Sequence, residues 1–210
     1  MRPRSILAFI KKLKRPVFTT HELSAISARS PSVVTQALNN LVRDGFVDKI
    51  YRGIWAEKGE RPISPYAIVP FLFPRARAYV SFLSALHLYG IIEQIPQVIT
   101  LASTTHARTI KTKIGAFHVH RISPSFFTGF KWYREEGDFL IAEPEKALID
   151  SLYISAYKNK RFSHFPELRF PKTFSARKTM AWVGKIPTPK TRVCVVEKLQ
   201  SLLRQNQINI

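Results

Sequence analysis

Amide and hydroxyl side chains recur at helical spacing between residues 31 and 43, where the sequence reads PSVVTQALNNLVR. An ordinary solvated helix face usually carries acidic and basic side chains in pairs, whereas this segment has a single arginine. Amides can pair with the donor and acceptor that adenine presents in the major groove of DNA, and hydroxyls can reach phosphates or either base edge. These residues could therefore read DNA, although a merely solvated face remains the alternative. The candidate contacts in and beside the segment are Arg29, Ser30, Ser32, Thr35, Gln36, Asn39, Asn40 and Arg43.

A helix must hold these side chains on its outer surface. Pro31 suits the first position of such a helix, and Ser30 can cap its amino terminus. Gly45 is expected just beyond its end, because glycine commonly follows the last helical residue. The inner face is predicted to consist of Val34, Leu38 and Leu41, with Ala37 and Val42 beside them.

Two further helices are predicted ahead of this one. Ser5 can cap the first, whose apolar residues fall at helical spacing up to residue 13. Thr19 and Glu22 stand three apart and fit a capping box that opens a short second helix. The inward residues of the second helix are expected to be Leu23 and Ile26.

A basic hairpin is predicted directly after the candidate contact helix. Residues 46–51 alternate well enough for a strand, Arg52 begins a tight turn, and residues 54–56 return. Helix, turn, helix and hairpin in this order are typical of a winged helix-turn-helix domain, which lays a helix in the DNA major groove. Lys49 and Arg52 are expected to meet phosphate or a narrow minor groove. Trp55 is expected to pack in the core.

The segment 57–65 is charged and contains glycine and two prolines, which is typical of a linker. We therefore expect a winged helix-turn-helix domain at residues 1–58 and a mixed α/β domain at residues 66–210. The whole chain would then belong to the α+β class. In the second domain we expect helices at 80–89, 143–153 and 193–204, strands at 97–102, 115–122, 126–134 and 139–142, a polar crossing at 104–113, and irregular chain after 158.

The formal net charge of the chain is +19, which favours a polyanionic partner and most simply nucleic acid. A basic protein without such a partner is the alternative. Cys194 is the only cysteine, so neither an internal disulfide nor a cysteine-based zinc site is expected. No stretch approaches the length of a membrane span, and we expect a cytoplasmic protein without a cofactor.

Acidic residues gather between positions 135 and 150 and raise the alternative of a metal-dependent nuclease. Such enzymes often carry a Glu-x-Lys pair, whereas here Glu145 is followed directly by Lys146. Helix capping and a solvated turn explain the cluster more simply. We therefore expect no enzymatic activity and no metal site.

Residues 151–192 are strongly basic, and Glu167 is their only acid. They could form a second phosphate-contacting surface, which would steepen the salt dependence of binding without adding sequence information. Scattered solvated charges are the alternative. Lys178 is the candidate DNA contact chosen from this region, whose further candidates are Lys158, Lys160, Arg161, Arg169, Lys172, Arg177 and Lys185.

Three segments together resemble one protein family. They are the wing end RGIWA at 52–56, the segment SALHLYG at 84–90 and the segment AEPEKALID at 142–150. Their order and spacing resemble the AbiEi-type antitoxins, the regulator half of abortive-infection (type IV) toxin–antitoxin operons. The resemblance covers residues 1 to about 155.

The resemblance implies a winged-helix transcriptional repressor that binds inverted repeats in its own promoter. It also implies an antitoxin domain that opposes a nucleotidyltransferase-like toxin encoded next door, without forming a stable complex with it. A standalone regulator that has no toxin is the alternative. For either function the expected partner is double-stranded DNA.

Overall fold

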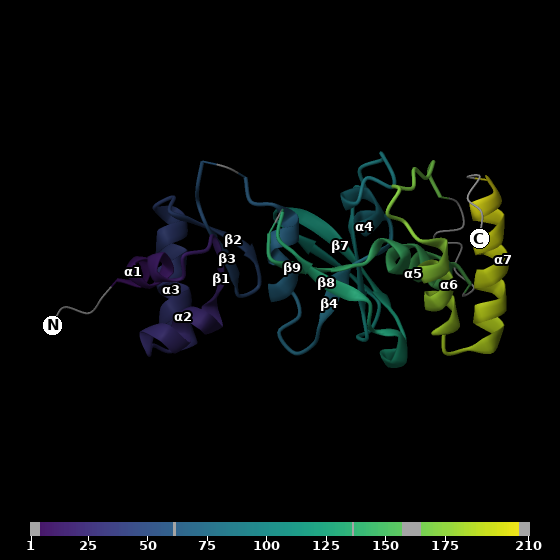
Figure 1. The fold of residues 1–210 in the computed structure, drawn as a ribbon. Helices are drawn as coiled ribbons and strands as arrows, with labels where there is room; N and C mark the ends of the chain where they lie inside the picture. Colours follow the sequence, from purple (N-terminus) through teal and green to yellow (C-terminus); the bar gives the residue numbers. More distant parts are fainter. Residues whose placement is uncertain (1–4, 61, 136, 157–164, 206–210) are drawn as a thin grey trace. The chain divides into compact units, whose positions relative to one another are not determined.

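The computed structural model describes residues 5–60, 62–135, 137–156 and 165–205. Within these ranges the fold is α+β, as expected, and its strands form two separate sheets. The chain divides into two compact units (Figure 1): unit 1 is Met1–Pro74 with Lys111–Gly115, and unit 2 is Arg75–Ile110 with Ala116–Ile210. No helix of the described residues is long and apolar enough to cross a membrane.

Unit 1 combines helices with a small antiparallel sheet. The strands are hydrogen-bonded in the order β1-β3-β2, so β2 lies at an edge. The elements in chain order are α1 (Ile6–Lys12), β1 (Val17–Thr19), α2 (Thr20–Ser27), α3 (Pro31–Arg43), β2 (Val47–Tyr51), β3 (Ile54–Glu57) and the 3-10 helix η1 (Pro65–Phe71).

Local capping signals set the ends of the first three helices as predicted. The hydroxyl of Thr19 accepts a hydrogen bond from the Glu22 amide at 3.1 Å, and the Glu22 carboxylate accepts one from the Thr19 amide at 2.8 Å. Ser30 caps α3, with Pro31 at the start of the helix. Ser5 caps α1 in the same way, by accepting from the amide of Ala8. Each cap satisfies an amide that the helix itself leaves unpaired.

An apolar core joins the three helices of unit 1 to its sheet. Trp55 is 1% exposed, and its indole nitrogen donates to the Thr20 hydroxyl at 2.8 Å, which confirms its predicted packing. Ile26 was expected to face inward but is 44% exposed. Helix α2 ends one residue later, and Ala28 turns the chain through a left-handed φ of 53°, so the last turn of α2 projects from the core. The buried residues of this core are Ile6, Ile10, Phe18, Leu23, Val34, Leu38, Val47 and Trp55.

Unit 2 is built on a mixed sheet with the strand order β6-β7-β5-β4-β9-β8. Strand β5 is antiparallel to β4 and parallel to β7, and β4 is parallel to β9. Its elements are β4 (Ala78–Val80), α4 (Phe82–Leu88), β5 (Ile99–Ser103), β6 (Arg108–Thr112), β7 (Gly115–Arg121), η2 (Pro124–Phe126), β8 (Phe130–Tyr133), β9 (Phe139–Ala142), α5 (Pro144–Ala156), α6 (Ala176–Gly184) and α7 (Pro189–Gln205).

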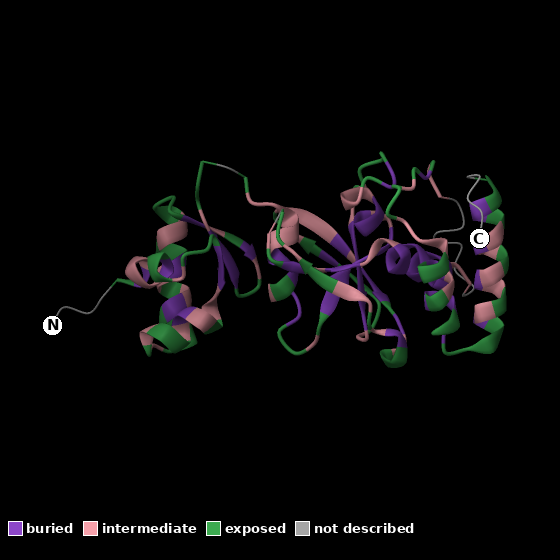
Figure 2. Cartoon of the chain, in the orientation of Figure 1, coloured by how far each residue is buried: buried purple, intermediate pink, exposed green. Residues whose placement is uncertain are grey.

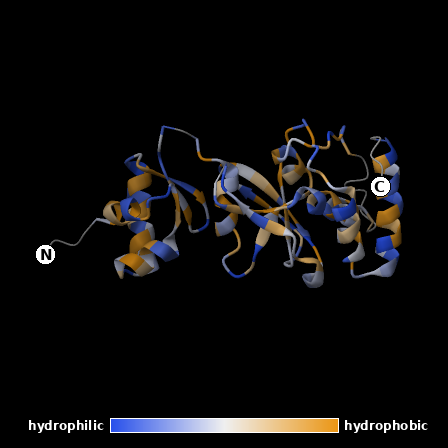
Figure 3. Ribbon diagram, in the orientation of Figure 1, coloured by the Kyte–Doolittle hydropathy of each residue, from blue (hydrophilic) through white to orange (hydrophobic). Residues whose placement is uncertain are grey.

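Helix α5 is the central helix of unit 2. It packs against α4, α6 and α7, and Figure 2 shows it buried along most of its length. Helix α7 is amphipathic, as its mixed colouring in Figure 3 shows, and it buries residues such as Val195 and Leu199. The packing of these helices buries α5, including its three charged residues Glu145, Lys146 and Asp150.

Two elements of unit 2 differ from the sequence expectations. The segment 104–113 was expected to be a crossing, but it contains strand β6, whose only buried residue is Ile110. An edge strand with a single buried apolar residue lacks the alternation of apolar and polar residues that predicts a strand from the sequence. The chain after 158 was expected to be irregular, but it contains α6, which is basic on its surface and buries Trp182 and Val183.

Three expected bounds in unit 2 shift. The helix expected at 80–89 begins only at Phe82, because Val80 pairs in strand β4. The strand expected at 126–134 begins at Phe130 and follows the short helix η2. Helix α7 begins at Pro189, earlier than the expected 193, because proline is well placed in a first helical turn.

Candidate nucleic-acid interface

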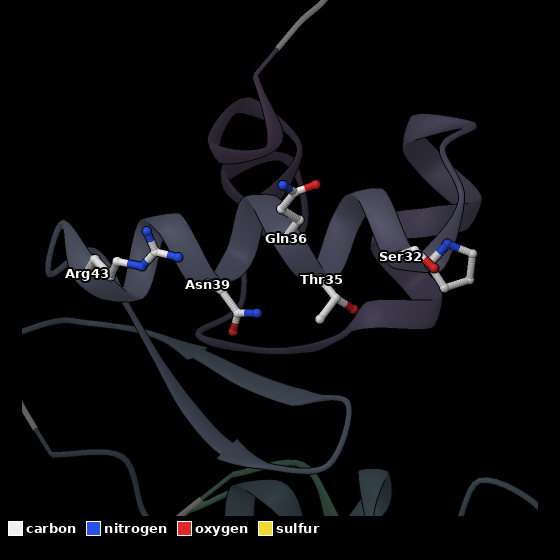
Figure 4. A pocket seen from close by; sticks show the side chains of 6 residues that line it. Ser32, Thr35, Gln36, Asn39 and Arg43 are labelled. Carbon is white, nitrogen blue, oxygen red and sulfur yellow. The ribbon is translucent and has the colours of Figure 1, made fainter.

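The outward face of α3 gathers five of the predicted contact residues. Ser32, Gln36, Asn39 and Arg43 are exposed, and Thr35 is half-buried. With Pro31 they line a hollow of about 500 Å³ along the helix, and Figure 4 shows the labelled side chains projecting from α3. The spacing explains the grouping, because residues three, four and seven apart share one face of a helix.

The polar groups on this face are available to a ligand. In the part of the chain that the structure describes, the side chains of Gln36, Asn39 and Arg43 form no hydrogen bond or ion pair with the protein. The face carries no acidic residue, and Asp44 lies just past the last residue of α3. A face with unpaired amides, hydroxyls and one guanidinium can donate to and accept from base edges and phosphates.

The remaining residues predicted near α3 lie just before its amino terminus and on its flank. Asn40 is exposed but does not line the hollow. The Ser30 hydroxyl accepts from the Val33 amide at 3.4 Å, so it already has a structural role. Arg29 is half-buried in the turn before α3, where its carbonyl accepts from the Ser24 hydroxyl.

The β2–β3 hairpin presents the other two predicted cations of unit 1. Arg52 is exposed at the turn, which Gly53 completes with a left-handed φ of 68°. Lys49 is exposed on β2, with its ammonium 5.4 Å from the centre of the Trp55 ring. Because Trp55 is buried in the core, its ring has a fixed position, and the cation–π contact helps to orient the Lys49 side chain.

Sequence reasoning missed two cations near this hairpin. Lys111 and Lys113 belong to unit 1, although more than fifty residues separate them from β2. The amide of Lys113 donates to the carbonyl of Ile50 at 3.1 Å, and its ammonium is paired with Asp48. No local pattern could have placed them there, because the contact depends on the tertiary fold.

A second hollow of about 350 Å³ lies beside the end of α1 and includes Lys11, Lys14 and Arg15. Lys11 is paired with Glu57, and Arg15 is paired with Glu22. Two of its three cations are therefore already neutralised by carboxylates of the same unit. This makes the hollow a weaker anion site than its composition indicates.

Lys178 lies elsewhere, on α6 of unit 2. Its ammonium is 3.0 Å from a Glu143 carboxylate oxygen and 3.5 Å from one of Glu145. The hydrogen bond to Glu143 raises the pKa of Lys178 above its usual value. A phosphate would have to compete with both carboxylates for this charge. Lys158, Lys160 and Arg161 of the predicted basic surface lie outside the described residues.

The acidic segment of unit 2 is only partly the solvated turn that we expected, because Glu135 and Asp138 are exposed but the acids on α5 are buried. Glu145 is 3% exposed and Asp150 is fully buried. Asp150 pairs with the buried Lys146 and accepts hydrogen bonds from the hydroxyls of Tyr79 at 3.0 Å and Ser81 at 2.7 Å. A carboxylate buried in this way needs such partners, because desolvation of an unpaired charge is costly.

The Lys146 side chain lies in an aromatic surrounding that explains its burial. Its ammonium is 3.9 Å from the centre of the Phe126 ring and 3.1 Å from the Tyr79 hydroxyl. Burial lowers the pKa of Lys146, although the neighbouring Asp150 opposes this shift. Among the described residues, no group of three or more histidine, cysteine, aspartate or glutamate side chains is arranged to hold a metal ion.

Comparison with known proteins does not assign a function to these residues. No protein-family model and no curated protein matches the chain. A functional proposal therefore depends on the residues described above. Of these, the unpaired polar face of α3 is the most informative.

Proposed function

We propose that the protein is a sequence-specific DNA-binding transcriptional repressor, and that unit 1 is a winged helix-turn-helix domain. In this proposal α2 and α3 form the helix-turn-helix, and β2 with β3 forms the wing. The observation that carries it is the exposed face of α3, whose amides and hydroxyls have no partner among the residues that the structure describes. A polar face without charge pairs suits hydrogen bonding to bases better than simple solvation.

The residues divide by the kind of contact that they can make. Gln36 and Asn39 read bases, because an amide can bind adenine through two hydrogen bonds. Lys49 and Arg52 reach phosphate or the minor groove from the wing. The remaining contacts are to phosphate or to either base edge, from Arg29, Ser30, Ser32, Thr35, Asn40 and Arg43.

We further propose that the protein represses its own operon in the cytoplasm and acts as an antitoxin against a nucleotidyltransferase-like toxin. This part rests on the resemblance to AbiEi-type antitoxins. In unit 2 the residues that carry the resemblance are largely buried, for example Ser84, Lys146 and Asp150. They support a shared core rather than a shared contact surface, so a standalone regulator remains the second candidate.

Selection of bound duplexes from a random pool tests DNA reading. We expect the protein to enrich one sequence, arranged as an inverted repeat. Gln36→Ala and Asn39→Ala should each weaken binding to that sequence by about 1–3 kcal/mol, or about 5- to 150-fold, if each amide binds a base. Binding to random duplex should change much less.

Gln94→Ala is a matched control, because it removes an exposed amide from a loop of unit 2. Its binding should equal that of the wild type. Failure of the wild-type protein to prefer any sequence over random duplex at moderate salt would contradict the repressor proposal. The toxin is tested separately, by co-expression with a nucleotidyltransferase-like gene found beside this one: rescue of growth supports the antitoxin, and no such gene or no rescue favours the standalone regulator.

A further inference from the structure

The residues 111–115, which comprise the end of β6, the turn and the first residue of β7 and are here called the hairpin tip, lie against the edge strand of the unit 1 sheet. The amide of Lys113 donates to the carbonyl of Ile50 on β2 at 3.1 Å. Gly115 approaches Pro65 closely enough that a side-chain carbon on it would lie 3.4 Å from the proline ring. The hairpin tip is therefore joined to the edge of this sheet by a backbone hydrogen bond, without becoming a fourth strand.

The hairpin tip also has a defined internal structure. The Thr112 hydroxyl donates to the carbonyl of Gly115 at 2.8 Å and accepts from the amide of Ile114 at 3.3 Å. These bonds hold the turn that carries Lys111 and Lys113. Both lysines are exposed; the ammonium of Lys113 is paired with Asp48, and no ion pair of Lys111 is found among the described residues.

Basic residues dominate the surface around β2. Lys113 and Lys58 both lower the pKa of Asp48, and the hydrogen bond from Lys113 has the largest effect. Of the other acids close to this strand in sequence, Glu57 is paired with Lys11, and Asp44 follows α3. The exposed cations of the wing and the hairpin tip are Lys49, Arg52, Lys58, Lys111 and Lys113.

We propose that the hairpin tip is a second part of the wing, which grips the phosphate backbone of DNA beside the segment that α3 reads. Lys111 contacts phosphate, and Lys113 cancels the charge of Asp48, which otherwise repels the backbone. The proposal rests on the DNA-binding function proposed above. It adds a contact that carries affinity but no sequence information.

Electrostatics explain why both lysines matter. Neutralising a phosphate with a lysine releases condensed counterions, so each contact adds about −0.9 to the slope of log affinity against log salt. A bare carboxylate on the wing acts in the opposite direction, because it repels the phosphates and keeps their counterions in place. Removing Lys113 therefore weakens binding through Asp48, and removing Asp48 as well reverses the loss.

The test measures binding of the full-length protein to its selected duplex and to random duplex over a series of salt concentrations. We expect Lys111→Ala to weaken both complexes by a similar factor and to reduce the salt slope by about 0.9. We expect Lys113→Met to weaken both complexes, and Asp48→Asn/Lys113→Met to restore wild-type affinity. Lys190→Ala, which removes an exposed lysine of α7, is the matched control and should change nothing.

Each outcome decides one of the two proposals. If the wild-type protein prefers a site but Lys111→Ala and Lys113→Met bind it normally, the hairpin tip does not contact DNA. If Lys113→Met weakens binding and Asp48→Asn/Lys113→Met does not restore it, Lys113 does not act by neutralising Asp48. If the wild-type protein binds without sequence preference and Lys111→Ala still lowers the slope, the tip proposal stands and the repressor proposal fails. A thermal melt of each variant separates these results from loss of folding.

Discussion

Helices α3 and α5 have similar construction but use their polar residues in opposite ways. Each has 13 residues and begins with a proline. On α3 the amides are exposed, and within the described part of the chain its amides and hydroxyls have no side-chain partners. On α5 the charged residues Glu145, Lys146 and Asp150 are at most 3% exposed and are paired with one another or with neighbouring groups.

The difference shows that residue type alone does not separate a binding face from a structural one. The sequence predicts solvated acids near α5 and an exposed contact surface on α3, although both helices carry polar residues. Burial and pairing are what distinguish them. A buried, paired charge specifies how its own unit packs, whereas an exposed, unpaired amide has its hydrogen-bonding capacity left for another molecule.

The largest expected effect comes from breaking the buried pair on α5. Asp150→Ala leaves the ammonium of Lys146 buried without a counter-ion and removes the acceptor for Tyr79 and Ser81. Removing one partner of a buried pair costs about 3–5 kcal/mol, and we expect a loss of this size in the free energy of unfolding. Chemical denaturation measures it.

Asp138→Ala is the control for that measurement, because it removes an acid whose side chain is 80% exposed. Its free energy of unfolding should stay within about 0.5 kcal/mol of the wild type. A loss below about 1 kcal/mol for Asp150→Ala would mean that the pair is not buried as described. The contrast between buried, paired charges on α5 and exposed amides on α3 would then not hold for α5.

The second prediction concerns the opposite property of α3. Gln36→Ala and Asn39→Ala remove exposed side chains that have no partner in the described ranges of the chain, so each should change the free energy of unfolding by no more than about 0.5 kcal/mol. Their effect on preference for the selected duplex should be several times larger. Measuring unfolding and binding on the same samples checks this contrast. Equal losses in both would mean that these amides stabilise unit 1, and would contradict their proposed role in reading DNA.

The first part of the chain was largely predictable because its signals are local. The capping box of Thr19 with Glu22 and the Ser30-Pro31 start of α3 each act within a few residues. Such patterns fix where helices begin, whatever the tertiary fold adds. The candidate face of α3 followed directly, since its residues share one side of one helix.

The missed features depend on residues far apart in sequence. Asp48 meets Lys113 across 65 positions, and Tyr79 meets Asp150 across 71. Strand β6 gains its place from the neighbouring β7 rather than from its own apolar pattern. A reader of the sequence sees these charges as solvated, because only the folded chain shows which of them are paired.

The third prediction concerns Ser30, which serves both as a cap and as a candidate DNA contact. Ser30→Ala should lower the free energy of unfolding by about 0.5–1 kcal/mol, because the hydroxyl accepts from the Val33 amide. Ser30→Gly should cost only a few tenths of a kcal/mol, since glycine is tolerated at this position. If the hydroxyl contacts DNA, both variants should lose the same binding affinity. If the loss of binding instead parallels the loss in free energy of unfolding across the two variants, Ser30 acts only as a helix cap.

The smallest expected effect concerns Lys178. Its sequence context predicts a contact with phosphate, whereas in the structure its ammonium is paired with Glu143 and Glu145 near the start of α5. Because the side chain is 47% exposed, Lys178→Ala should lower the free energy of unfolding at neutral pH by only about 0.2–1 kcal/mol. Lys172→Ala, an exposed lysine nearby, is the control. The raised pKa of Lys178 means that this stabilisation is complete below the usual lysine pKa of 10.5 and is lost as the pH rises through the higher folded value. The difference in free energy of unfolding between wild type and Lys178→Ala should therefore vanish in strong alkali. Unchanged stability together with a salt slope for DNA binding reduced by about 0.9 would instead assign Lys178 to the phosphate-contacting surface.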